Sequence, residues 1–103
     1  MISIYLGDSK IFHIETYAVT GDGVSTVSAT PVSGYFSLIR INDQSAIIDH
    51  VNNISISGNH VFYELTPAVN VDAGLCVYVF DVYFSSGYKE TYTSFVEIKA
   101  VGV

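Results

Sequence analysis

Hydrophobic and polar residues alternate along most of this chain with a period of two. The alternation is strictest over residues 60–65, where Val61, Tyr63 and Leu65 fall in one phase. Such a period places successive side chains on opposite faces of a β-strand. β-branched and aromatic residues, which favour strands, are more than twice as numerous as the residues that favour helices. The pattern therefore predicts an all-β fold.

Turn-forming segments divide the chain into short strands at regular spacing. We expect strands over residues 2–6, 10–20, 34–41, 46–50, 54–57, 60–65, 75–84 and 88–100. Residues 24–31 form either a loop or a weak edge strand, because Pro31 cannot donate a ladder hydrogen bond. Seven or eight strands with this spacing describe one domain over residues 1–103, a two-sheet immunoglobulin-like β-sandwich. A small β-barrel is the alternative, because the pattern does not show whether the sheet closes.

The segments between the strands carry turn residues. Tight turns are predicted at residues 7–9, 21–23, 42–45, 57–59 and 85–87, which are rich in Gly, Asn, Asp and Ser. Residues 66–74 are bracketed by Pro67 and Gly74, and we expect them to cross from one sheet to the other.

Both phases of the strands are rich in apolar residues. We assign to the core the phase formed by Phe12, Ile14, Phe36, Leu38, Val61, Tyr63, Leu65, Cys76, Tyr78, Phe80, Val82 and Phe84. The opposite phase then holds Tyr17, Tyr35, Ile39, Ile41, Phe62, Val77, Val79 and Tyr83. A free-standing sandwich presents polar residues on its outer faces, and contiguous apolar surface marks contact sites. We predict that these eight residues form a protein interface, unless residues 24–31 or the termini cover them.

Length and charge narrow the class of protein. A chain of 103 residues makes one small domain. Charged residues are 14% of the chain, against roughly 25% in average domains. Ten acidic residues against four basic ones give a net charge of −6, which excludes a nucleic-acid partner that needs basic stripes. The apolar runs are far shorter than a membrane span, and the N-terminus lacks the pattern of a signal peptide, so we expect synthesis in the cytoplasm and no membrane partner.

Residues with reactive or metal-binding side chains are scattered along the chain. His13, His50 and His60 lack the spacing that brings two imidazoles onto one metal, and we expect them to lie apart on strand faces or turns. The one cysteine, Cys76, lies in the most apolar strand and is predicted to be buried and unreactive. No serine lies in a Gly-x-Ser-x-Gly motif. We therefore predict no catalytic residue, no metal and no cofactor, and a protein that is not an enzyme.

The C-terminal half carries a recognisable run of residues. Thr66-Pro67 is followed by Asp72-Ala73-Gly74, by the apolar strand ending at Phe84, and by Ser86-Gly87-Tyr88-Lys89-Glu90-Thr91. This run resembles the immunoglobulin-like domains of tailed-bacteriophage virion proteins, and above all the N-terminal domain of baseplate upper proteins. The resemblance extends over residues 34–98. Cys76 departs from it, because such domains place a tyrosine there that can form a tyrosine-corner hydrogen bond.

The resemblance implies a structural role in a virus particle. It implies a capsid decoration (cement), neck or tail protein, made in the host cytoplasm and located in the virion. The implied partners are other virion proteins of the capsid or tail, bound in many copies per particle. The alternative is a carbohydrate- or host-surface-binding module that uses tyrosines as stacking platforms. Its binding loops would need aromatic residues, and the predicted loops hold none before Tyr88.

Overall fold

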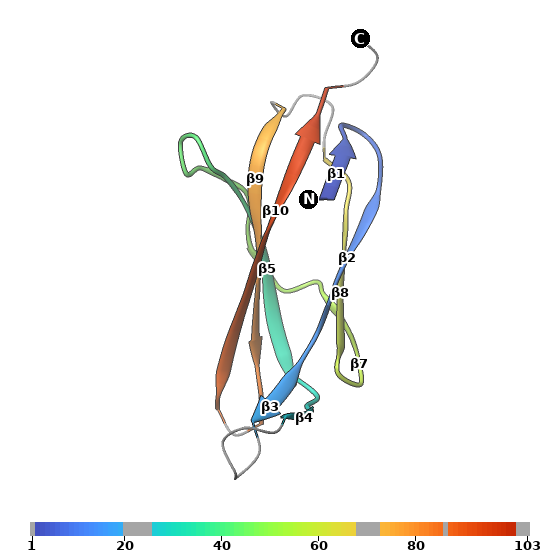
Figure 1. The fold of residues 1–103 in the computed structure, drawn as a ribbon, viewed down its shortest axis with the longest axis vertical. Helices are drawn as coiled ribbons and strands as arrows, with labels where there is room; N and C mark the ends of the chain where they lie inside the picture. Colours follow the sequence, from blue (N-terminus) through green and yellow to red (C-terminus); the bar gives the residue numbers. More distant parts are fainter. Residues whose placement is uncertain (1, 20–25, 68–72, 86, 101–103) are drawn as a thin grey trace.

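The computed structural model describes residues 2–19, 26–67, 73–85 and 87–100, which form ten strands (Figure 1). In chain order the strands are β1 (Ile2–Tyr5), β2 (Lys10–Glu15), β3 (Tyr17–Val19), β4 (Thr26–Ser28), β5 (Ser33–Arg40), β6 (Ala46–Val51), β7 (Ser55–Ser57), β8 (His60–Leu65), β9 (Gly74–Tyr83) and β10 (Lys89–Lys99). Within these ranges there is no helix, and hence no helix that could cross a membrane.

The strands form two main sheets that face each other. One has five strands in the order β1-β10-β9-β5-β6, and the other has three in the order β2-β8-β7. β3 and β4 form a separate two-stranded ladder, which lies at one end of the molecule in Figure 1. β1 runs parallel to β10, and the other ladders are antiparallel. The fold is thus the predicted all-β, immunoglobulin-like sandwich, and its two main sheets remain open and do not close into a barrel.

The predicted core phase is confirmed. Phe36 lies at the centre, where its ring stacks on Tyr63 at 4.0 Å, meets Phe80 edge-on at 5.1 Å and lies 5.8 Å from Phe12. These contacts join the sheets, because β5 and β9 carry Phe36 and Phe80 while β2 and β8 carry the other two rings. All twelve predicted core residues lie in the buried cluster or pack against it. β1 and β10 add three buried residues that the sequence prediction omitted: Ile4, Val96 and Ile98.

The predicted continuous strand over residues 10–20 is wrong, because Thr16 interrupts it. Thr16 is fully buried, and its N–H donates to the carbonyl of Asn59 at 2.8 Å. Its hydroxyl donates to the carbonyl of Ala29. These bonds end the pairing of β2 with β8 and begin that of β3 with β4. Of the two alternatives for residues 24–31, the structure shows the edge strand, which is β4. This strand and the break at Thr16 bring the number of strands in the described residues to ten, instead of the predicted seven or eight.

Two predicted turns are confirmed with their chemistry. Asp43 closes the turn at residues 42–45, because its Oδ1 accepts from the Ser45 N–H at 3.0 Å and from the Ser45 hydroxyl at 2.7 Å. Gln44 adopts a φ of 58° between them. Gly58, with a φ of 60°, occupies the first central position of the two-residue turn between β7 and β8, where glycine is favoured.

Some predicted segments lie wholly or partly outside the described residues. They are the turn at residues 21–23, the end of the 10–20 strand, the start of the 24–31 segment, the middle of the 66–74 crossing and Ser86 in the last turn. The two ends of the crossing agree with the prediction, because β8 belongs to the three-stranded sheet and β9 to the five-stranded one.

Cys76 should react slowly with thiol reagents in the folded protein. Its side chain is 1% exposed within the core, and burial raises the pKa of the thiol, so less thiolate is present at any given pH. We expect alkylation more than ~100-fold slower than in urea, because the reagent needs an opened structure. Alkylation that is quenched after a series of times and analysed by mass spectrometry measures the ratio of the two rates. Equal rates in the folded and in the urea-unfolded protein would mean that the Cys76 side chain lies on the outer face of β9.

Candidate functional site

The outer face of the five-stranded sheet carries a row of apolar side chains. Ile39 of β5 pairs with Val77 of β9, and Val77 pairs in turn with Phe95 of β10, so the three side chains lie side by side across three strands. Ile41 and Leu75 extend this row, since the Ile41 N–H donates to the Leu75 carbonyl at 3.2 Å. Phe95 is 53% exposed. We call these five residues the apolar row.

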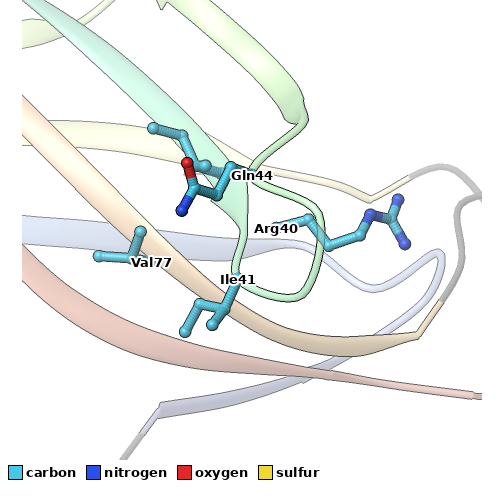
Figure 2. Close-up of a pocket in the computed structure, with 5 residues that line it drawn as sticks. Arg40, Ile41, Gln44 and Val77 are labelled. Atoms are coloured by element: carbon cyan, nitrogen blue, oxygen red, sulfur yellow. The ribbon is translucent and has the colours of Figure 1, made fainter.

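A shallow hollow of about 380 Å³ opens beside the apolar row. It is lined by Ile39, Ile41 and Val77 of the row together with Arg40 and Gln44. Figure 2 shows the side chains of Val77, Ile41 and Gln44 around the hollow, while the guanidinium of Arg40 points away. The turn that follows β5 thus closes one side of the hollow and places a polar amide beside an apolar floor. A partner side chain with an apolar body and a polar tip fits this arrangement.

The opposite end of the same face is aromatic and polar, and its groups are already paired. Tyr35 stacks on His50 with ring centroids 4.0 Å apart and meets Tyr83 edge-on at 6.1 Å. His50 lies in the irregular part of the β5–β6 pairing with a φ of 51°. Asp81 accepts a hydrogen bond from Thr91 at 2.7 Å. The exposed large apolar residues of β9 and β10, Leu75 and Phe95, both belong to the apolar row.

The eight predicted interface residues are divided between different parts of the molecule. Six come from the outer face of the five-stranded sheet and its adjoining turn: Tyr35, Ile39, Ile41, Val77, Val79 and Tyr83. Phe62 lies on the outer face of the other sheet, and Tyr17 lies on β3. Sequence reasoning missed Leu75 and Phe95, although the alternation over residues 88–100 already places Phe95 opposite the buried Val96 and Ile98.

The outer face of the three-stranded sheet brings together two histidines and a carboxylate. Glu15 of β2 pairs directly with His60 of β8, and His13 lies two residues before Glu15 on the same face. His13 Nε2 is 2.8 Å from His60 Nδ1, which in turn is 3.8 Å from Glu15 Oε1. The expectation that the three histidines lie apart is therefore wrong for His13 and His60. We call His13, Glu15 and His60 the histidine cluster.

Two aromatic residues hold the histidine cluster in place. Phe62 stacks on the His13 ring with centroids 4.7 Å apart. The Tyr17 hydroxyl donates to Glu15 Oε2 at 2.6 Å, and this hydrogen bond is the main reason why the pKa of the Glu15 carboxyl is lowered. The same hydrogen bond raises the pKa of Tyr17. Tyr17 and Phe62 were both predicted as interface residues, and in the structure each contacts a member of the histidine cluster.

Comparison with known proteins supports the fold. No family model matches the chain, and no curated protein matches it significantly. Among solved structures, CopC from Methylosinus trichosporium OB3b is similar, with a TM-score of 0.61 over 99% of this chain and 86% of that chain. The two sequences are 10% identical, so the similarity shows a shared fold alone. The resemblance to virion proteins stays a prediction.

Proposed function

We propose that this chain is a non-enzymatic structural protein of a tailed-bacteriophage virion, which binds a neighbouring capsid or tail protein through the apolar row. The observation that carries the proposal is the apolar row itself. It places Ile39, Val77 and Phe95 in register across three neighbouring strands, with Phe95 more than half exposed. The resemblance of residues 34–98 to virion domains supplies the identity of the assembly.

Burial of the apolar row would stabilise a complex substantially. Fully burying one large apolar side chain contributes roughly 1.5–3 kcal/mol. The ladders of β5, β9 and β10 hold the row in register before binding, so little conformational entropy would be lost when a partner docks. The adjoining hollow offers a recess for one anchor side chain of the partner.

Charge favours a different protein over a second copy as the occupant. The chain carries a net charge of −6, so two copies repel each other. A partner with a neutral or basic surface is attracted instead, and the same charge keeps free copies apart before assembly. We therefore assign the apolar row to a virion protein of another kind, bound in many copies per particle.

The carbohydrate-binding alternative has less support from the aromatic side chains. A sugar needs an accessible ring face on which to stack. One face of Tyr35 is covered by His50, and one face of Phe62 by His13. At most one face of each of these two rings is therefore left for a sugar.

Adding charge to the apolar row tests the proposal. The double substitution Phe95→Asp with Ile41→Asp should leave the isolated domain folded, since both side chains are exposed. It should reduce incorporation into particles by more than about 100-fold, because each lost contact weakens binding roughly tenfold or more. Particles from the phage that encodes the chain, purified and probed with an antibody, measure the occupancy.

A matched control separates loss of the apolar row from added charge. Ile11→Asp makes the same kind of change at a residue of β2 that is 62% exposed on the other sheet, and it should assemble at full occupancy. Full occupancy of the double variant would exclude the apolar row as the contact. Self-association that the double substitution abolishes would identify a second copy as the occupant and contradict the proposed partner.

A further inference from the structure

The histidine cluster lies outside the proposed docking surface, on the outer face of the opposite sheet. We propose that His13, Glu15 and His60 form a binding site for a divalent transition-metal ion that prefers imidazole ligands, such as Zn²⁺ or Cu²⁺. The site would use His13 Nε2, His60 Nδ1 and Glu15 Oε1 as its three protein ligands, and water would complete the coordination.

The distances in the histidine cluster are close to those of a metal site. Ligand atoms about 2.0–2.1 Å from one ion lie roughly 2.9–3.4 Å apart for angles between 90° and the tetrahedral value. The two ring nitrogens are 2.8 Å apart, and His60 Nδ1 lies 3.8 Å from Glu15 Oε1. All three ligand atoms lie within 4.8 Å of one another. Small side-chain rotations, each moving a ligand atom by less than about 1 Å, are enough to centre an ion.

The strand register makes the histidine cluster a preorganised arrangement. Glu15 and His60 are direct partners in the β2–β8 ladder, and His13 reaches His60 along the diagonal. Because the three ligands come from two hydrogen-bonded strands, their Cα positions change little when an ion binds. The hydrogen bond between the two rings gives way to the ion, since a neutral imidazole can move its proton to the other ring nitrogen.

The surroundings of the ligands resemble the supporting shell of a metal site. Ligating carboxylates are commonly held by a hydrogen bond to the oxygen that does not bind the ion. Tyr17 donates in this way to Glu15 Oε2 and leaves Oε1 directed at His60. The Phe62 ring fixes the plane of His13 by stacking on it. These two contacts give Tyr17 and Phe62 a positioning role.

The ligand types select the class of ion. Two imidazoles and one carboxylate suit zinc, copper and nickel. Calcium prefers six or more oxygen ligands, and magnesium prefers oxygen ligands and keeps several of its bound waters. Glu15 and His60 keep 45% and 42% of their side-chain surface exposed, so an ion can enter directly from solvent. Among divalent ions Cu²⁺ should bind most tightly, as the general order of stability predicts.

Calorimetric titration of the untagged chain with Zn²⁺, Cu²⁺ and Ca²⁺ tests the site. We expect one Zn²⁺ or Cu²⁺ per chain and no saturable Ca²⁺ binding. His13→Phe and His60→Phe keep a ring on the sheet but remove the ligand nitrogens, and each should weaken binding at least tenfold. Tyr17→Phe should weaken it about tenfold through loss of the supporting hydrogen bond. The electron paramagnetic resonance spectrum of bound Cu²⁺ should show two nitrogen ligands, reduced to one by His13→Phe.

The third histidine supplies the matched control. His50→Asn removes an imidazole from the other sheet and suits the left-handed backbone at that residue, so it should leave ion binding unchanged. Binding of Zn²⁺ and Cu²⁺ that is equally tight in the wild-type chain and in His13→Phe would overturn the proposal, as would a loss in His50→Asn as large as that in His60→Phe. If circular dichroism shows that a Phe variant does not fold, Glu15→Gln is measured in its place. Weaker ion binding by Glu15→Gln supports the site. Unchanged ion binding, together with a Cu²⁺ spectrum that lacks two nitrogen ligands, excludes the site.

Discussion

Replacing Phe36 by Ala should lower the free energy of unfolding by about 3–5 kcal/mol, a large part of what holds a small domain together. The Phe36 ring is fully buried and contacts Phe12, Tyr63, Tyr78 and Phe80 from both sheets. Its removal takes away the transfer free energy of a large side chain and leaves a cavity that strands on a fixed ladder cannot fill by collapsing. Urea unfolding followed by tyrosine fluorescence and circular dichroism measures the change.

A second phenylalanine provides the reference for this measurement. Phe95 is 53% exposed on the outer face of the five-stranded sheet, so Phe95→Ala should change stability by roughly 0.5 kcal/mol or less. A cost for Phe36→Ala no greater than that for Phe95→Ala would contradict the assignment of the core. A small cost for Phe95→Ala would also show that the folded domain does not need this side chain of the apolar row for its stability.

Replacing Gly34 by Ala should destabilise the protein by about 1–3 kcal/mol through steric overlap. A Cβ atom at Gly34 would lie 2.7 Å from the backbone oxygen of Asp81 and 2.8 Å from Cδ1 of Ile54. The Asp81 carbonyl belongs to the β5–β9 ladder and cannot move without loosening the pairing of Gly34 with Val82. The loss of stability should appear as a lower urea concentration at the midpoint of unfolding, with an unchanged dependence of the unfolding free energy on urea.

A different glycine distinguishes steric overlap from backbone strain. A Cβ atom at Gly58 would meet open space, but the residue has a φ of 60°, so the conformation and not the space restricts what can replace it. Asn adopts a positive φ more readily than Ala, so Gly58→Asn should cost less than Gly58→Ala, whereas Gly34→Asn should cost more than Gly34→Ala because the larger side chain overlaps further. The same order of costs at both glycines would show that β5 and β9 separate easily at Gly34.

The two proposed binding features can be tested independently because they lie on different sheets. The apolar row belongs to β5, β9 and β10 and to the turn after β5, and the histidine cluster belongs to β2 and β8. Substitutions on one outer face leave the ladder of the other intact. An ion bound by the histidine cluster would therefore leave the apolar row accessible to a protein partner.

The alternation of the chain determined the fold class, the core and the sharpest turns. Alternation over residues 60–65 is a local property, and it correctly assigned Val61, Tyr63 and Leu65 to the interior. The turn at residues 42–45 was predictable for the same reason, since Asp43 and Ser45 satisfy each other within four residues. Such features depend only on neighbours along the chain.

The tertiary structure decided which distant residues meet. Thr16 ends β2 because its hydrogen-bond partners, Asn59 and Ala29, come from other parts of the chain. His13 and His60 are 47 residues apart in sequence, and only the register of β2 against β8 brings their ring nitrogens to 2.8 Å. A shift of that register by one residue would turn one of them to the opposite face. Register is determined by the packing of the whole sandwich, so alternation within single strands could not reveal the histidine cluster.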